Sequence, residues 1–328
     1  MSLSSSLASS FTMNNGLLHP KLSFGVYKIG YVPSSSSSAS STSSSSSLPT
    51  NSRSTKDILI DAIRTYPMLD CAEFYNNEVQ VGEAISHCLS SNLISRSNLF
   101  VATKVWTTTI YEGREAVISQ VKKSIADLQC SHLDLVNVHW PVPNKHVEAY
   151  RALEHCVELG LVKSIGLSNY SIEDYEELMQ SEKKIKIKPV VNQIEINPFL
   201  WRGVTVDYFR GKGVVLESYR TLCDGKRFDD ETILKMAAKY EKSSAQILGR
   251  FCVQQDIVPI LKSVKLERMV ENSQIENFEI EEADMDELRA LTTEENKAKF
   301  LALYRKCVNR DTPKDGTMDG VKDKITVD

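Results

Sequence analysis

The stretch Leu99-Phe-Val-Ala-Thr-Lys104, followed by residues 114–128 and then by Leu133-Asp-Leu-Val-Asn-Val-His139, decides the fold. The first and third segments are short apolar runs rich in Val and Leu, which is typical of buried strands. The segment between them carries charge at helical spacing, which is typical of an amphipathic helix. A strand, a helix and a second strand in this order predict a parallel sheet.

The same alternation continues along the chain and gives eight candidate strands, most of them separated by about 25 to 35 residues, as in a (β/α)8 barrel. The alternative is a doubly wound sheet of six or seven strands with a side domain. A dinucleotide-binding sheet of that kind also needs G-x-G-x-x-G after its first strand, and the sequence lacks this motif. We therefore predict the barrel. The candidate strands are residues 21–26, 68–71, 99–104, 133–139, 162–167, 189–194, 214–218 and 257–261.

Composition limits the classes of protein that this chain can belong to. Its 328 residues are 41% hydrophobic and 25% charged, with a formal net charge of -4, which suits an ordinary globular protein and argues against a nucleic-acid binder. The sequence has no apolar run of the ~18 residues that would span a bilayer. Its seven cysteines show no zinc-type spacing, so we expect reduced thiols, no metal and a cytoplasmic location. Organelle targeting is less favoured, because the first lysine or arginine is Lys21.

One segment departs from the alternating pattern. Between Ser34 and Ser47 the chain consists of serine apart from Ala39 and Thr42. Such a segment cannot bury enough apolar area to offset its chain entropy, so we predict a disordered insertion at residues 33–55. The remaining boundaries predict a disordered N-terminus at residues 1–12, one barrel domain at residues 13–310 and a C-terminal tail at residues 311–328 that frays.

Polar residues follow the candidate strands, where barrel enzymes place their active sites. Each has an ordinary structural explanation, such as a helix cap for an aspartate or solvation for a lysine, but together they indicate one site at the mouth of the barrel. These residues are Asp70, Tyr75, Lys104, His139, Ser168, Asn169, Gln193, Tyr219, Lys262 and Ser263.

Four of these residues are suited to reducing a carbonyl group. The ammonium group of Lys104 would lower the pKa of Tyr75, which would act as general acid. Asp70 would keep Lys104 charged and oriented, and a neutral His139 would donate a hydrogen bond to the carbonyl oxygen. Because side chains cannot donate a hydride, this chemistry implies a nicotinamide cofactor.

The segment Lys262-Ser-Val-Lys-Leu-Glu-Arg268 is the candidate phosphate site. It begins a predicted helix, where free N–H groups and three cations would hold a 2′-phosphate and so favour NADPH over NADH. The alternative is a basic helix start that faces solvent.

Several of these segments resemble the aldo-keto reductases. The resemblance lies in Leu69-Asp-Cys-Ala72 with Tyr75-Asn-Asn-Glu78, in Ala102-Thr-Lys-Val-Trp106 and in Asn137-Val-His-Trp-Pro141. It extends over about residues 13–310, apart from the serine tract, and includes a similarity of Met13-Asn-Asn-Gly16 to the N-terminal hairpin of the family.

The resemblance implies a monomeric (β/α)8 barrel that reduces an aldehyde or ketone with NADPH, using Asp70, Tyr75, Lys104 and His139 as the catalytic tetrad. It also implies the contacts with the cofactor. Ser168, Asn169 and Gln193 would bind the carboxamide, and Tyr219 would stack on the nicotinamide ring. The 2′-phosphate would be held by Lys262, Ser263 and Arg268. Glu271 and Asn272 would contact the adenine, and Leu222 and Val264 would line the same cofactor site. Tyr27, Trp106 and Trp140 would form the substrate pocket.

Two departures and one alternative function accompany this interpretation. Arg220-Thr-Leu222 replaces the Ser-Pro-Leu that is common in the family, and the short loop at residues 141–148 predicts an open, shallow pocket. The alternative is a cofactor-bound subunit of the same fold that senses redox state or binds a partner with little turnover. The presence of the catalytic tetrad argues against redox sensing or partner binding as the only role of the chain.

Overall fold

The computed structural model describes residues 9–30, 53–182, 184–309 and 325–328. The serine tract and most of the predicted C-terminal tail lie outside these residues. The expected disorder of residues 33–55 therefore stays a prediction for residues 33–52. It is wrong at Ser54 and Thr55, because the Ser54 side chain accepts from Asp57 N and caps the helix that begins at Thr55.

Eight parallel strands close into a barrel, in the order β10-β3-β4-β5-β6-β7-β8-β9. The (β/α)8 prediction is therefore confirmed. The strands coincide with the eight predicted apolar runs, although several are shorter. They are β3 (Ser23–Gly25), β4 (Met68–Asp70), β5 (Phe100–Val105), β6 (Leu133–Val138), β7 (Val162–Ser168), β8 (Val191–Glu195), β9 (Val215–Tyr219) and β10 (Ile257–Leu261).

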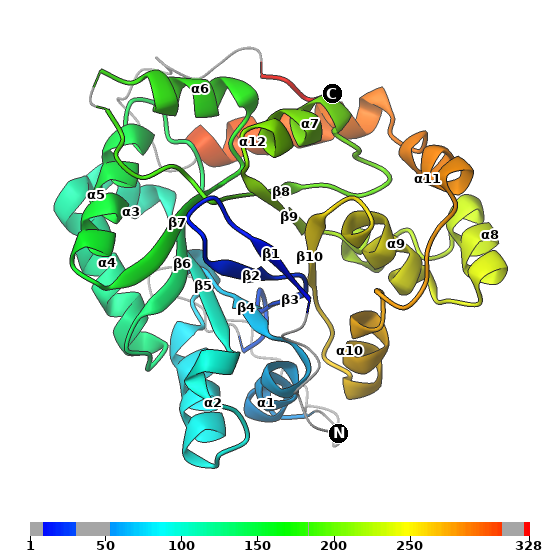
Figure 1. Ribbon diagram of the computed structural model, residues 1–328, viewed down its shortest axis with the longest axis horizontal. Coiled ribbons are helices and arrows are strands. Elements are labelled where there is room, and N and C mark those ends of the chain that lie inside the picture. The colour runs from blue at the N-terminus through cyan, green and yellow to red at the C-terminus, as the bar shows by residue number, and fades with distance from the viewer. Residues whose placement is uncertain (1–8, 31–52, 183, 310–324) are drawn as a thin grey trace, which may run out of the picture.

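Helices surround the barrel as a ring (Figure 1). All six residues of β6 are buried, because one face of the strand points into the barrel and the other packs against helices. The helices are α1 (Thr55–Thr65), α2 (Glu78–Ser90), α3 (Thr107–Glu112), α4 (Arg114–Asp127), α5 (His146–Glu158), α6 (Ile172–Gln180), α7 (Gly203–Gly211), α8 (Glu231–Tyr240), α9 (Ser244–Val253), α10 (Leu266–Ser273), α11 (Glu282–Arg289) and α12 (Glu294–Asn309).

A hairpin lies across the end of the barrel that faces the viewer in Figure 1. It consists of β1 (Ser10–Thr12) and β2 (Leu18–Pro20), and the Asn15 amide joins its turn to the hydroxyl group of Ser164 at 3.0 Å. The predicted N-terminal hairpin is confirmed. The prediction that residues 1–12 are disordered is wrong for β1, because antiparallel pairing with β2 orders a serine-rich segment that has little strand propensity of its own.

The last four residues are docked on the barrel, so the prediction of a fraying tail is wrong there. The Asp328 carboxylate accepts hydrogen bonds from Val204 N and from the backbone and hydroxyl groups of Thr205, at the start of α7. Arg202, which is almost fully buried, donates to Thr326 O at 3.0 Å. A carboxylate at a helix N-terminus satisfies free N–H groups and favours the helix dipole, which explains this attachment.

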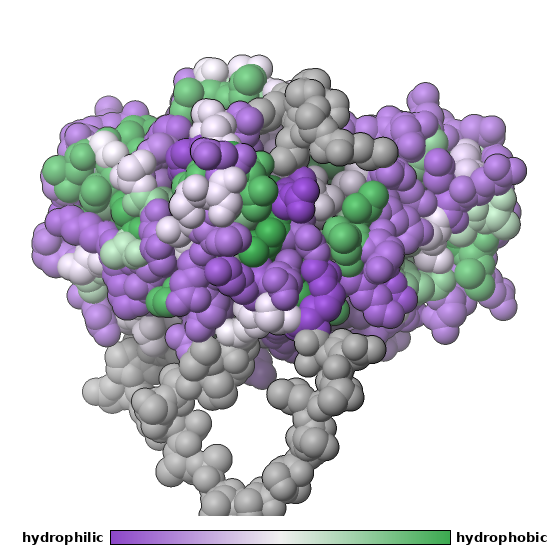
Figure 2. All heavy atoms as spheres, turned by 90° about the horizontal axis from the view of Figure 1, so that it is seen from below, coloured by the Kyte–Doolittle hydropathy of each residue, from purple (hydrophilic) through white to green (hydrophobic). Residues whose placement is uncertain are grey.

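The side of the molecule in Figure 2 is largely hydrophilic, with apolar residues in small separate groups. Among the described residues, no helix combines the length and the apolar character needed to cross a membrane.

Candidate active site

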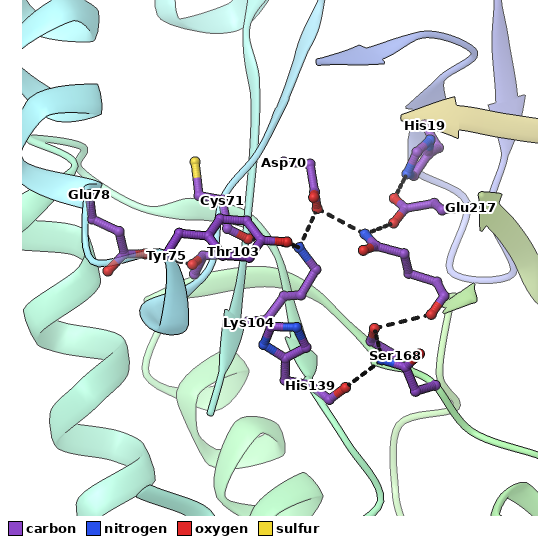
Figure 3. A network of polar contacts seen from close by, with 12 residues as sticks. His19, Asp70, Cys71, Tyr75, Glu78, Thr103, Lys104, His139, Ser168 and Glu217 are labelled. Atoms are coloured by element: carbon purple, nitrogen blue, oxygen red, sulfur yellow. Dashed lines mark hydrogen bonds and ion pairs between the residues drawn. The ribbon is translucent and has the colours of Figure 1, made fainter. Parts of the chain in front are cut away.

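Two tetrad residues, Asp70 and Tyr75, contact the ammonium group of Lys104, which is buried at the end of β5. Lys104 Nζ lies 2.7 Å from Asp70 Oδ1, 2.9 Å from Cys71 O and 3.3 Å from the Tyr75 hydroxyl oxygen. An ammonium group has three protons and no acceptor, so these contacts use all of them. The Tyr75 oxygen therefore acts as the acceptor from Lys104, which leaves the phenol proton free to be donated elsewhere (Figure 3).

The loop after β4 places Tyr75 at this point. Asp70 ends the strand, and residues Glu73–Tyr75 form one turn of 3-10 helix that ends at Asn76 in the left-handed region (φ 51°). The Asn77 amide then donates to Val26 O at 2.9 Å and to Ile29 O at 2.7 Å, which ties the loop to the segment after β3. Asparagine tolerates the left-handed backbone better than most residues, so the sequence Tyr-Asn-Asn suits this turn.

Burial governs the acidity of the tetrad. It raises the pKa of Tyr75 to about 12, because desolvation of the phenolate outweighs the opposing charge of Lys104. The expected lowering of the Tyr75 pKa is therefore wrong in its net direction. Burial lowers the pKa of Lys104, but the negative charge and the hydrogen bond of Asp70 oppose this, and the pKa lies above its usual value. Lys104 is a cation and Tyr75 a phenol at neutral pH.

His139 lies beside these residues in its neutral form. Burial, and then the charge of Lys104, hold its pKa well below its usual value. Its ring makes edge contacts with Tyr75 at 6.1 Å and with Trp106 at 4.9 Å between ring centroids. The structure thus brings all four predicted catalytic residues together at the carboxyl ends of neighbouring strands.

The residues predicted to bind the carboxamide form a connected group next to the tetrad. Ser168 Oγ donates to Gln193 O at 3.0 Å, and the Asn169 amide donates to His139 O at 3.0 Å. The Tyr219 hydroxyl group donates to Asn169 Oδ1 at 2.7 Å, so its ring is held at the same mouth of the barrel. Asn169 has a positive φ of 62°, which turns the chain at the end of β7.

The predicted phosphate site lies at the start of α10, beyond β10. Burial, and then the positive charge of Lys28, lower the pKa of Lys262. In the part of the chain that the structure describes, Lys28, Lys262 and Arg268 have no carboxylate within ion-pair distance. Lys28 and Lys262 repel each other, and cations without a carboxylate partner suit an anion, so these residues fit the phosphate of a dinucleotide.

The other predicted cofactor residues lie in the same region. Val264 is exposed and its carbonyl accepts from Arg53, a cation that the sequence analysis did not include. Ser263 accepts from Lys265 N at 3.1 Å, and Asn272 is buried on α10. The remaining two are Glu271, which is half-buried on α10, and Leu222, which packs on the core before the short helix Cys223–Gly225.

Comparisons with known proteins agree with this geometry. The model of the aldo/keto reductase family matches residues 42–293. The chain belongs to the aldo/keto reductase family. It is 32% identical to the glyoxal reductase of Bacillus subtilis, over 88% of this chain and 95% of the relative. It is 31% identical to the NADP-dependent D-sorbitol-6-phosphate dehydrogenase of Malus domestica, over 70% of this chain and 83% of the relative. A solved Bombyx mori aldo-keto reductase in complex with NADP superimposes with a TM-score of 0.74 at 25% identity, over 86% of this chain and 92% of the other.

In this aldo/keto reductase, the three residues predicted to line the substrate pocket have different exposures. Tyr27 is 42% exposed, and its ring lies 5.0 Å from that of Tyr75. Trp106 and Trp140 are buried and share one apolar cluster with Tyr304 of α12. The sequence analysis missed Glu73, whose carboxylate accepts from Trp106 N at 2.6 Å and so fixes Trp106 beside His139.

Sequence reasoning also missed Glu217 and His19, which are both fully buried and lie 2.8 Å apart below the tetrad. A signal was available, because Glu217 interrupts the apolar run Val-Val-Leu-Glu-Ser of a buried strand. Among the described residues, no group of three or more His, Cys, Asp or Glu side chains could hold a metal ion.

Proposed function

We infer that this aldo/keto reductase reduces an aldehyde or ketone to an alcohol, with NADPH as the reductant and Tyr75 as the proton donor. The observation that carries this inference is the hydrogen-bond geometry around Lys104. Its three N–H bonds point to Asp70, Cys71 and Tyr75, so the Tyr75 oxygen accepts and its own proton remains to be donated.

The tetrad residues have distinct tasks in this reaction. When bound, the cofactor supplies a hydride to the carbonyl carbon. Tyr75 donates its proton to the carbonyl oxygen, on which negative charge develops, and the charge of Lys104 stabilises the phenolate that remains. Asp70 keeps Lys104 charged and in place, and the neutral imidazole of His139 donates a hydrogen bond that orients the substrate oxygen.

The choice of NADPH rests on the charges at the start of α10 and on the relatives. Lys28, Lys262 and Arg268, which have no ion-pair partner among the described residues, supply positive charge where a 2′-phosphate would bind. The apple relative is named as NADP-dependent, and the silkworm structure contains NADP. The side chains of Ser168, Asn169 and Gln193 would hold the carboxamide end.

The test of the proposed function is NADPH oxidation, followed at 340 nm, with a panel of carbonyl compounds. The panel includes glyoxal and methylglyoxal, because one relative is a glyoxal reductase, together with sugar and aromatic aldehydes. We expect turnover with NADPH and at least about tenfold less with NADH at equal concentration. Binding of NADPH without turnover of any compound would contradict carbonyl reduction and favour the redox-sensing alternative.

We expect Arg268→Ala to raise the dissociation constant of NADPH about tenfold, because it removes one charge-assisted contact with the 2′-phosphate. The dissociation constant of NADH should stay unchanged, since NADH has no 2′-phosphate. Both constants can be measured by quenching of protein fluorescence. Arg210→Ala on α7 is the matched control. An equal loss for both cofactors would place Arg268 outside the 2′-phosphate site.

We expect His139 to stay neutral as the pH falls through about 6.5, where a free imidazole titrates. Its pKa is lowered by burial and by Lys104, so the unfolded chain binds this proton on acidification while the folded chain does not. The free energy of unfolding should therefore fall as the pH drops below the pKa of the unfolded state. The imidazole ¹⁵N signal of His139 is assigned by its absence in His139→Gln and is then followed as a function of pH. A titration of that signal near pH 6.5 would contradict the prediction.

A monomer in the cytoplasm stays a prediction. Light scattering during size-exclusion chromatography tests the oligomeric state, and fractionation of the cells that produce the protein tests the location.

A further inference from the structure

A line of buried polar contacts runs from the N-terminal hairpin to the catalytic site (Figure 3). His19 Nε2 on β2 lies 2.8 Å from Glu217 Oε1 on β9. Gln193 Nε2 on β8 lies 2.6 Å from Glu217 Oε2 and 2.8 Å from Asp70 Oδ1 on β4. All four side chains are almost completely buried. The hairpin is therefore connected to Asp70, and through it to Lys104 and Tyr75.

The donors and acceptors around His19 define where the protons are. His19 Nδ1 lies 2.8 Å from Pro20 O, and a carbonyl oxygen can only accept, so Nδ1 must carry a proton. The contact between Nε2 and Glu217 then contains one further proton. If this proton lies on Nε2, His19 is an imidazolium and Glu217 is a carboxylate. If it lies on Glu217, Glu217 is a neutral acid and His19 is a neutral imidazole.

The charges around Glu217 favour the imidazolium and the carboxylate. The charged or titratable groups near it are His19, Asp70 and Lys104. Burial raises the pKa of Glu217, but the hydrogen bond and charge of His19, with the bond from Gln193, lower it more. With His19 charged, the two carboxylates and the two cations have no net charge, which a buried site tolerates best.

The same carboxylate determines which way the Gln193 amide points. Its NH2 group has two protons, and one goes to Glu217 while the other goes to Asp70. Within the described part of the chain, no donor contacts Gln193 Oε1. The side chain therefore presents an acceptor, and the NH2 group of a nicotinamide carboxamide is a donor that matches it.

We propose that His19 and Glu217 form a positioning pair, in which one shared proton keeps Glu217 as the carboxylate that fixes Gln193 with its carbonyl oxygen toward the carboxamide of the cofactor. The pair is built from the hairpin and β9, and it does not touch the reacting atoms. This inference rests on the proposed function for the identity of the cofactor, but it can be tested without turnover.

The decisive variant is the double substitution His19→Leu with Glu217→Leu. It removes both buried polar groups together, so it leaves no uncompensated charge and should fold. The NH2 group of Gln193 then keeps only the hydrogen bond to Asp70, so the amide group can rotate. We expect the dissociation constant of NADPH, measured by fluorescence quenching, to rise about tenfold or more, while the KM of the carbonyl substrate changes less than about threefold.

Glu217→Gln is the conservative variant that should restore binding. Its amide oxygen still accepts from Gln193 and its NH2 group donates to a neutral His19. We therefore expect a dissociation constant within about threefold of wild type. Glu154→Gln, which changes a buried carboxylate bonded to the backbone of Lys186 and Ile187, is the matched control.

The shared proton has its own test in the protein without cofactor. The imidazole ¹⁵N signals of His19 should show both nitrogens protonated in wild type, and one unprotonated nitrogen in Glu217→Gln.

NADPH binding by the folded double variant within about threefold of wild type would overturn the positioning role. If wild type binds NADPH but reduces no carbonyl compound, the proposed function fails while the comparison of dissociation constants still decides this proposal.

Discussion

Replacing Tyr75 with phenylalanine is expected to lower kcat for carbonyl reduction by about 10²- to 10⁴-fold, the usual contribution of a general acid. The substitution removes the phenol proton that the contact with Lys104 leaves free for the substrate and keeps the ring, with its contacts to Tyr27 and His139. NADPH binding should stay within about threefold of wild type, because the Tyr75 hydroxyl group bonds to Lys104 and to none of the predicted cofactor residues.

The measurement is a single-turnover experiment with enzyme-bound NADPH, which separates the chemical step from cofactor binding and product release. Tyr111→Phe on α3 is the matched control, and its kcat should equal that of wild type. A Tyr75→Phe enzyme that keeps a tenth or more of the wild-type rate would require another proton donor.

Replacing Lys104 with methionine is expected to damage both activity and stability. The side chains of Lys104 and Asp70 are 1% and 3% exposed, and Lys104 is the ion-pair partner of Asp70. Leaving a buried charge without its partner costs about 3–5 kcal/mol of the free energy of unfolding. Burial already raises the pKa of Asp70, and Lys104 opposes that rise, so Asp70 in the variant should take up a proton. We also expect kcat to fall by at least about 100-fold, because the phenolate of Tyr75 loses its cation.

Urea unfolding followed by tryptophan fluorescence measures the change in stability. The double variant Asp70→Asn with Lys104→Met should recover most of the lost free energy of unfolding, because it leaves no buried charge, but it should remain as inactive as the single variant. If Lys104→Met alone were as stable as wild type, the ion pair would not have the energetic role that its burial implies.

The barrel and the tetrad could be predicted from sequence because each depends on local pattern. The alternation of apolar runs with amphipathic segments gives the strands and helices, and the barrel places residues that follow successive strands at one mouth. Asp70, Lys104 and His139 each lie within one residue of the end of a predicted strand, so finding the strands was enough to bring them together.

The features that sequence reasoning missed depend on contacts between distant segments. The pKa of Tyr75 depends on how completely the loop after β4 is covered, and this depth is not encoded in any short motif. His19 and Glu217 meet only because the hairpin closes the barrel below β9. Likewise, the docking of Asp328 on α7 joins residues that no periodicity relates.

The closure of the barrel also has a consequence for synthesis of the protein. Strand β3 pairs with β4 on one side and with β10 on the other, through Ser23 with Ile260 and Phe24 with Leu261. A nascent chain on the ribosome therefore exposes two unpaired strand edges, one on β3 and one on the newest strand, until β10 has emerged. Exposed edges pair with other chains, so we expect polypeptides that stop before Ile257 to aggregate or to occupy chaperones rather than to form a smaller barrel.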